Sequence, residues 1–173
     1  MRTLFATLFI ALVAASAPAM AQDAEPQPII LTELTSASIG KVWVAIKKCM
    51  EDVGCPKPQA YTEPGSTDDD GPMKGKWVSE YCMLQEGTDS VKAYIKKYSE
   101  LPRIRGGIWT TCRVQYTFNL KEVEDGKVKI ILRAQMSGYE EFITQSTHFW
   151  PSNGILERDM MARILKAATA EGN

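Results

Sequence analysis

Cysteine is the residue type with the most definite chemistry in this sequence. The chain contains four cysteines, Cys49, Cys55, Cys82 and Cys112, and a single histidine, His148. An even number of cysteines in an exported chain is typical of disulfide bonds. A zinc site is not expected, because no C-x-x-C pair occurs and the histidine lies far from the cysteines in the sequence. We therefore predict two disulfide bonds and no bound metal.

The elements around the cysteines predict how they pair. A helix that ends at Gly54 would place Cys49 and Cys55 at the two positions that touch in a Schellman cap. Cys82 and Cys112 flank a long segment between two predicted strands. A bond between them would close a loop of about 30 residues and stabilise the fold by roughly 3–4 kcal/mol. The predicted bonds are Cys49–Cys55 and Cys82–Cys112.

Groups that could catalyse a reaction are sparse. His148 could act as a base, but no G-x-S-x-G turn accompanies it, and a histidine beside Phe149 and Trp150 is typical of a strand. Glu140 and Glu141 are adjacent, so a strand would point them to opposite faces and prevent a paired-carboxylate site. No phosphate-binding or dinucleotide-binding fingerprint occurs. We predict no catalytic residue, no cofactor and no enzymatic activity.

The acidic run Asp68-Asp69-Asp70 before Gly71 raises the question of calcium. The ligands of an EF-hand loop alternate with spacers and end in a distant glutamate, and this run has neither feature. We interpret it as a solvated acidic turn.

The first 21 residues have the pattern of a secretory signal peptide. Arg2 precedes an apolar run at 4–15 that is too short to span a bilayer, and the Ala-Met-Ala sequence at 19–21 is a cleavage site. We therefore predict bacterial Sec-type export to the periplasm or beyond, cleavage before Gln22, and no stable membrane insertion. The 20 basic and 21 acidic residues nearly balance, which gives no support to nucleic-acid binding.

The elements that must position these residues are organised around residues 108–136. Apolar residues occupy the even-numbered positions from 112 to 120 and alternate with polar ones, and the stretch 128–136 repeats the pattern. Period-two alternation predicts two half-buried strands. The Asp125-Gly126 dipeptide between them predicts a hairpin turn.

Loop length decides the register of this hairpin. A two-residue loop would place even-numbered residues opposite odd-numbered ones. A three-residue loop at 124–126, with Gly126 at positive φ, instead places Phe118 opposite Leu132. We adopt the second register, although it sets Lys121 opposite Lys129 on the solvent face.

The other elements are assigned from cap residues, breakers and apolar spacing. They are a short strand at 29–31, a helix from the cap residues 35–38 to Gly54, a loop at 56–75, a strand at 76–84, a helical excursion at 85–107, a turn at Ser137-Gly138, a strand at 142–150, and a helix capped by Ser152 or Asn153. They predict a single α+β domain at 36–170 behind a lead at 22–35. Its antiparallel sheet would have about four strands, with two helices on the even-numbered face and a small helical excursion. Trp43, Ile46, Phe118, Leu132 and Leu156 are expected together in the core.

A basic and aromatic patch is expected beside the excursion. If Cys82 pairs with Cys112, the register places Tyr81 opposite Arg113 on the face away from the helices. Trp, Tyr and Arg are the residue types of interface hot spots. The predicted partner-binding residues are Trp77, Tyr81, Lys92, Lys96, Arg103, Arg105, Trp109 and Arg113. The alternative is that the excursion helix folds back and covers these aromatic residues.

The order of elements resembles a known family of envelope proteins. A helix ending near Gly54, a strand with Arg113 and Tyr116, the sequence DGKVKI at 125–130 and the sequence NGILERDMMARIL at 153–165 together resemble the periplasmic helix-grip modules of the BamC lipoprotein type, over residues 36–168. The chain departs from that family in lacking a lipobox cysteine, in its four cysteines and in the excursion. The resemblance implies a non-enzymatic envelope module that binds other proteins.

The leading hypothesis is therefore an exported interaction protein or accessory subunit of an envelope complex. Because arginines such as Arg103 and Arg105 bind carboxylate or phosphate bidentately, its partner is expected to be an acidic protein surface or an anionic envelope polymer. The alternative is a protein that binds a small apolar ligand or lipid between the helices and the sheet.

Overall fold

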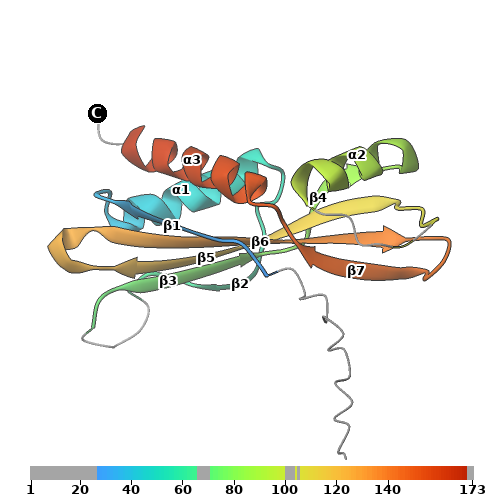
Figure 1. The fold of residues 1–173 in the computed structure, drawn as a ribbon. Coiled ribbons are helices and arrows are strands. Elements are labelled where there is room, and N and C mark those ends of the chain that lie inside the picture. The colour runs from blue at the N-terminus through green and yellow to red at the C-terminus, as the bar shows by residue number, and fades with distance from the viewer. Residues whose placement is uncertain (1–26, 66–70, 100–103, 105, 171–173) are drawn as a thin grey trace, which may run out of the picture.

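The computed structural model describes residues 27–65, 71–99, 104 and 106–170. Within them, seven strands form one antiparallel sheet, and three α-helices lie on one side of it (Figure 1). The predicted α+β class is confirmed, but the expectation of about four strands and two helices is wrong. The predicted signal peptide at 1–21 and the acidic run at 68–70 lie outside the described residues.

The strands differ greatly in length. The elements in chain order are β1 (Ile30–Thr35), α1 (Ile39–Asp52), β2 (Pro58–Thr62), β3 (Lys74–Ser79), β4 (Cys82–Glu86), α2 (Thr88–Tyr98), β5 (Thr111–Glu122), a 3-10 turn (Glu124–Gly126), β6 (Val128–Glu140), β7 (Ser146–Pro151) and α3 (Ile155–Ala170). The sheet runs in the order β1-β6-β5-β3-β2, with β4 also paired to β5 and β7 also paired to β6. The two long strands β5 and β6 therefore form its centre.

The β5–β6 hairpin has the register predicted from its sequence. Phe118 lies opposite Leu132, and Lys121 lies opposite Lys129. Gly126 has a φ of 68°, as the three-residue loop requires, and Asp125 has a φ of 65° as well. The even-numbered residues from 112 to 120 and from 128 to 140 are buried. Local alternation and turn chemistry thus predicted this part of the sheet correctly.

Each central strand is longer than its outer neighbours, so two short strands share its free edge. Along β5 the partner changes from β3 to β4, and along β6 it changes from β1 to β7. At the first junction the hydroxyl of Ser79 accepts the N–H of Tyr116 at 2.9 Å. At the second, the carboxylate of Glu157 accepts the N–H of Ala134 at 3.1 Å. Two buried side chains therefore complete the hydrogen bonding that the sheet leaves open at these points.

Helix α1 begins and ends as its sequence predicts. The side chain of Ser38 accepts a hydrogen bond from the N–H of Lys41. At the other end, the N–H of Gly54 donates to the carbonyl of Glu51 and the N–H of Cys55 donates to that of Met50. This is the predicted Schellman cap, with Gly54 at a φ of 74°.

Helix α3 begins at a small polar network. The N–H of Gly154 donates to the hydroxyl of Ser152, and the N–H of Ile155 donates to the side-chain oxygen of Asn153. Ser152 also donates to the carboxylate of Glu157, which is fully buried. Glu157 therefore does more than favour the helix dipole, because it connects the first turn of α3 to the sheet.

Three expectations about local structure are wrong. The predicted loop at 56–75 contains β2, an edge strand whose mostly exposed residues leave no apolar periodicity. The predicted strand at 76–84 is two strands, β3 and β4. Ser137-Gly138 is not a turn, since β6 continues to Glu140 and the last strand starts at Ser146. A side chain at Gly138 would meet the carbonyl oxygen of Thr111 at 2.7 Å, so this glycine serves a close approach of chains.

The disulfide pairing also differs from the prediction. Cys55 is bonded to Cys82, with their Cα atoms 5.5 Å apart, while Cys49 and Cys112 are buried free thiols. Cys82 lies opposite Val114, and Cys112 lies further along β5, opposite Gln85. The bond therefore connects the end of α1 to the start of β4. Burial raises the pKa of Cys112 to about 11, and burial followed by the charge of Asp52 raises that of Cys49, so neither thiol is reactive.

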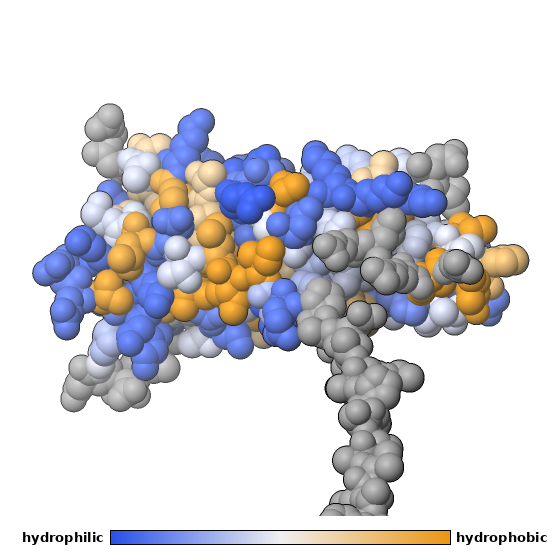
Figure 2. Space-filling view, viewed as in Figure 1, coloured by the Kyte–Doolittle hydropathy of each residue, from blue (hydrophilic) through white to orange (hydrophobic). Residues whose placement is uncertain are grey.

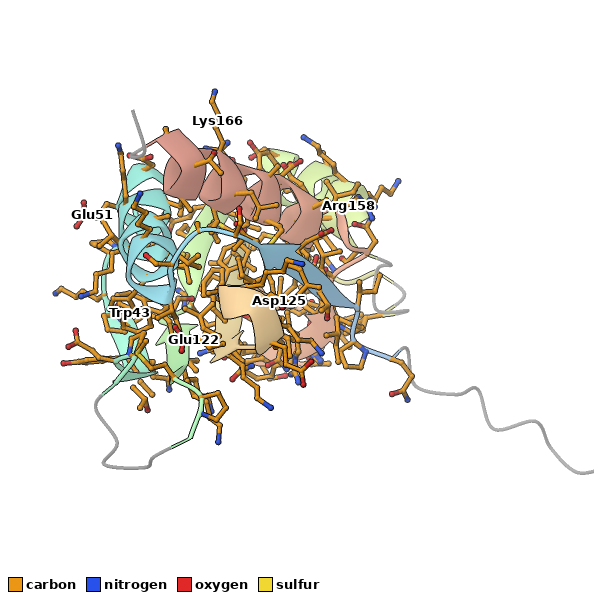
Figure 3. All side chains as sticks on the ribbon, turned by 90° about the vertical axis from the view of Figure 1, so that its left-hand side faces the viewer. Trp43, Glu51, Glu122, Asp125, Arg158 and Lys166 are labelled. Carbon is orange, nitrogen blue, oxygen red and sulfur yellow. A yellow bond between two sulfur atoms is a disulfide. The ribbon has the colours of Figure 1, made fainter. Side chains whose placement is uncertain are left out.

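The helices bury the even-numbered face of the central strands. The expected core residues Trp43, Ile46, Phe118, Leu132 and Leu156 all belong to one buried cluster. Val91 and Ile95 bring α2 into the same cluster. Seen along the strands, α1 and α3 lie side by side over the sheet, and Lys166 points away from it (Figure 3). None of the helices formed by the described residues lies on the opposite face of the sheet (Figure 1).

Candidate partner-binding surface

The structure places the two predicted tryptophans in the core. Trp77 lies opposite Phe118 and is 4% exposed, and Trp109 is 5% exposed. The predicted register with Tyr81 opposite Arg113 implies that Trp77 lies opposite Thr117, one residue away. A shift of one residue moves a strand residue to the other face of the sheet, so Trp77 faces the helices instead of solvent. Trp109 contacts Trp150, with ring centroids 5.4 Å apart.

The remaining residues of the predicted patch are divided between two sides of the molecule. Lys92 and Lys96 are exposed on α2, which packs on the helix side of the sheet. Arg113 and Tyr81 belong to the opposite side. Arg103 and Arg105 lie outside the described residues. The excursion helix packs on the helix side of the sheet, where Trp77 contacts Trp43 of α1, while Tyr81 contacts Phe149 on the opposite side. The structure therefore shows neither a single exposed patch nor an excursion helix that covers all of its aromatic residues.

The side of the sheet opposite the helices, here called the open face, carries a different cluster of cations. Lys74 of β3 lies directly opposite Lys121 of β5, which lies directly opposite Lys129 of β6. Strand alternation turns all three away from the buried face. We call these three residues the lysine row. Lys76, Arg113 and Arg133 extend the cationic surface along the same strands.

None of these six cations forms an ion pair with a residue in the described part of the chain. Outward-facing positions of β3, β5 and β6 carry no acidic residue. Like charges directly opposite on neighbouring strands destabilise a sheet. The open face is therefore a region of positive potential on a chain with a formal net charge of −1.

Aromatic and apolar side chains lie among these cations. Tyr81 and Phe149 contact each other with centroids 5.6 Å apart, and the Tyr81 hydroxyl donates to the side-chain oxygen of Gln135 at 3.4 Å. Burial raises the pKa of Tyr81, and the charge of Arg133 opposes that rise. Met83 is 45% exposed beside Arg113. The surface thus combines aromatic, methionine and arginine side chains, which are enriched in protein interfaces.

Leu34 continues the lysine row onto the edge strand β1, where it lies opposite Lys129. Figure 2 shows apolar surface along this edge, where Ile29, Ile30 and Leu34 are exposed. A broad hollow of about 670 Å³ between Leu34, Lys121 and the hairpin turn adjoins the row. Acidic residues of the turn also line the hollow. The lysine row is therefore more uniformly cationic than the hollow.

Part of the sequence signal for this surface lies in the central hairpin. The opposition of Lys121 and Lys129 follows from the predicted hairpin register. Lys74 lies in the predicted loop at 56–75 and Lys76 begins the predicted strand at 76–84, so the prediction does not place Lys74 opposite Lys121. Reading the alternation of Lys74, Lys76 and Val78 as one exposed strand face would have completed the row.

Glu140 orders the turn between β6 and β7, and His148 belongs to the same hydrogen-bond network. The buried carboxylate of Glu140 accepts the N–H groups of Ile108, Phe142, Ile143 and Thr144. Burial opposes its ionisation, but these hydrogen bonds hold the pKa of Glu140 well below its usual range.

The hydrogen bonds of this turn also decide the role of the imidazole. The hydroxyl of Thr144 donates to Glu140 at 2.9 Å, so its oxygen must accept the proton on Nε2 of His148 at 2.7 Å. The same Nε2 lies 3.2 Å from the hydroxyl of Ser146. A nitrogen that carries a proton cannot take one from Ser146, so this pair is not an activated nucleophile.

Other site types find little support in the described residues. Among them, no group of three or more His, Cys, Asp or Glu side chains is placed to hold a metal ion. None of the helices in the described ranges is long and apolar enough to cross a membrane. No protein-family model matches the chain, and comparison with curated proteins finds no relative.

Proposed function

We propose that this chain is an exported, non-enzymatic interaction protein that binds the acidic surface of another envelope protein through the open face of its sheet. The lysine row is the observation that carries the proposal. Lys74, Lys121 and Lys129 are directly paired across three strands, although each such pair costs stability. Sequence features that oppose stability concentrate at functional sites. An acidic partner would remove the repulsion on binding.

The composition of the open face favours a protein partner over an anionic polymer. A polymer chain of phosphates or carboxylates would be satisfied by cations alone. Here Tyr81, Met83 and Phe149 supply exposed or half-exposed apolar contact area beside Arg113 and Arg133. Apolar anchors surrounded by charge are the usual composition of a protein interface.

Export to an oxidising compartment agrees with two observations. The N-terminal pattern at 1–21 is that of a signal peptide. Cys55 and Cys82 form a disulfide bond, a link that persists in secreted and periplasmic proteins and is rare in the cytosol. We propose a periplasmic or secreted location on this basis.

Site-specific photo-crosslinking tests the proposed surface. A photoreactive amino acid replaces Asn119, which lies on the open face between Lys76 and Ile131. The control position is Ala162, which is exposed on α3. We expect the Asn119 probe in intact cells to form a covalent adduct with a protein that carries an acidic interface. The Ala162 probe should not form that adduct.

Two outcomes would contradict the proposal. Equal adducts from both positions would mean that the open face has no preference for the partner. An adduct of the Asn119 probe with a polysaccharide or glycolipid, and with no protein, would instead assign the surface to an anionic envelope polymer.

A second candidate function rests on a pocket of about 350 Å³ at the start of α1. Its lining is largely apolar and includes Ile39, Trp43 and Met73, and Figure 3 shows Trp43 near Glu122 at this end of the molecule. The indole N–H groups of Trp43 and Trp77 are buried without a hydrogen-bond partner among the described residues. A small apolar molecule with one acceptor would suit a pocket of this size.

Thermal unfolding with a panel of fatty acids and lipids separates the two functions. A ligand of the Trp43 pocket should raise the melting temperature by mass action. The increase should be smaller in Trp43→Phe, which lacks the indole N–H. If no lipid changes the melting temperature, the second candidate is wrong and the docking proposal is unaffected.

A further inference from the structure

A small cleft lies between α2 and α3 on the helix side of the sheet, away from the open face. It has a volume of about 150 Å³ and reaches down to β4 and β5. Leu84, Leu156 and Met160 form apolar walls, while Tyr116, Asp159 and Arg163 supply polar groups. At roughly 30 Å³ per water molecule in the liquid, its volume corresponds to about five waters. Only a small molecule would fit.

The walls of this cleft are held in place by hydrogen bonds between the end of α2 and the segment that leads into α3. The N–H of Asn153, just before α3, donates to the carbonyl of Tyr98 at 2.7 Å. The side chain of Asn153 donates to the carbonyl of Lys97 at 3.0 Å. The indole N–H of Trp150 donates to the hydroxyl of Ser99 at 2.7 Å. The end of α2 is therefore fixed against the start of α3, and the cleft is preformed.

The side chain of Tyr116 lies deep in the cleft and has an unused polar group. Tyr116 is 5% exposed, and its backbone N–H is bonded to Ser79. Its hydroxyl forms no hydrogen bond with any residue in the described ranges. Burial, with a further contribution from Glu157, raises the pKa of Tyr116 far above its usual value, so the phenol stays protonated and can donate. The fully buried polar atoms without a partner do not include this hydroxyl, so it opens onto the cleft and is free to bond a ligand there.

Two opposite charges line the same cleft from one face of α3. Asp159 and Arg163 are four residues apart, a spacing that permits an ion pair along a helix. Neither forms an ion pair or hydrogen bond with a described residue. An anion alone would be repelled by Asp159, and a cation alone would be repelled by Arg163. A molecule that carries both charges would satisfy both side chains.

We propose that this cleft binds a small zwitterion of the amino-acid class. Its ammonium group lies at Asp159, its carboxylate lies at Arg163, and a short polar side chain reaches the hydroxyl of Tyr116. The guanidinium group suits a carboxylate, which it can bind through two parallel hydrogen bonds. The small volume excludes long side chains. This inference does not rest on the docking proposal, although Met83 of β4 borders both the cleft and the open face.

Isothermal titration of the mature chain with L-serine and glycine tests the proposal. Acetate and ethylamine serve as controls that carry one charge each. We expect saturable 1:1 binding of both amino acids, with serine binding more tightly because its hydroxyl reaches Tyr116. Acetate and ethylamine should bind at least about tenfold more weakly, since each leaves one charged partner unused.

Three variants assign the binding to the cleft. Arg163→Gln should weaken both amino acids by about tenfold or more. Tyr116→Phe should leave the melting temperature unchanged or slightly higher and make serine bind no better than glycine. Lys166→Gln removes a cation from the same helix outside the cleft and should change nothing.

The proposal is overturned if neither serine nor glycine binds at millimolar concentration. It is also overturned if Arg163→Gln binds them as the parent chain does. A lower melting temperature for Tyr116→Phe without ligand would show that the hydroxyl is used by the fold, which contradicts the basis of the proposal.

Discussion

The two faces of the sheet are built from alternate residues of the same strands, yet they have opposite character. On the helix side, Phe118 and Leu132 face each other and are fully buried. The neighbouring pair on the same two strands, Thr117 of β5 and Arg133 of β6, faces the open side of the sheet. The lysine row crosses the same strands nearby. One face is complementary to elements of its own chain. The other presents unpaired charge that nothing in the described part of the chain neutralises.

This difference indicates how stability and binding are divided in the molecule. The helix-covered face supplies the free energy of folding through apolar burial. The open face contributes little to it and contains pairs that oppose it. Substitutions on the first face should therefore change stability, and substitutions on the second should change binding. The following predictions test this division, from the largest expected effect on stability to the smallest.

Replacement of Phe118 by alanine should have the largest effect. Phe118 is fully buried at the centre of the core cluster, so its removal leaves a cavity between β5 and the helices. We expect a loss of about 3–5 kcal/mol in the free energy of unfolding, measured by urea denaturation. Thr117→Ala, on the neighbouring position of the open face, should cost less than about 1 kcal/mol. Similar losses for both would contradict the division between the two faces.

Removal of the Cys55–Cys82 bond should have the next largest effect. The bond spans 27 residues of sequence, and closing a loop of that size stabilises by about 3–4 kcal/mol in the chain-entropy treatment. Cys55→Ala combined with Cys82→Ala should lose stability of that order, and a reducing agent should not destabilise this variant further. Cys112→Ala should remain sensitive to reduction. If peptide mapping without reduction finds Cys49 bonded to Cys55, the Cys55–Cys82 pairing is wrong.

The buried carboxylate of Glu140 should make stability depend on pH. Its pKa is lower in the folded chain than in the unfolded chain, where the ordinary value is about 4.5. As the pH falls below that value, the unfolded chain takes up this proton before the folded chain does. The free energy of unfolding of the parent chain should exceed that of Glu140→Gln by its full amount above pH 4.5. This difference should decline as the pH falls further.

Chemical denaturation at a series of pH values measures this effect. Glu141→Gln is the matched control, because Glu141 is exposed. The same pH dependence in both comparisons would show that Glu140 does not hold its turn by accepting backbone hydrogen bonds.

Neutralising the lysine row should have the smallest effect, and of opposite sign. In the triple variant Lys74→Gln, Lys121→Gln and Lys129→Gln, two directly opposed like-charge pairs disappear. We expect the free energy of unfolding to stay the same or to rise by up to about 1 kcal/mol, and the gain to shrink with added salt. A loss of more than about 1 kcal/mol would show that these lysines support the fold.

The contrast between the faces also explains how far the sequence could predict the structure. In the β5–β6 hairpin, the alternation and the Asp125-Gly126 turn set the register, because both signals lie within the segment itself. The register of β3 depends on β5, which is distant in sequence, and on Ser79, which accepts the N–H of Tyr116 where β3 ends. A one-residue error there moved Trp77 from the core to the predicted binding patch.

The disulfide pairing failed for a related reason. The Schellman cap of α1 is predicted correctly, since Gly54 and Cys55 donate to the carbonyls of Glu51 and Met50. The partner of Cys55 was decided instead by the break between β3 and β4, which brings Cys82 against the cap. That break has no local sequence signal comparable to the glycine of the cap. Contacts between segments that are distant in sequence therefore determine both the disulfide bond and which residues lie on the candidate binding surface.

The most direct measurement of the docking proposal combines crosslinking with stability. The Asn119 photo-probe is placed in the parent chain, in the triple lysine-row variant, and in a control triple variant, Lys41→Gln, Lys48→Gln and Lys166→Gln. The control removes the same charge from exposed positions of α1 and α3. We expect the protein adduct to be lost in the lysine-row variant, whose melting temperature is equal or higher, and to persist in the control. An unchanged adduct in the lysine-row variant, or an equal loss in both variants, would contradict the assignment of the open face as the binding surface.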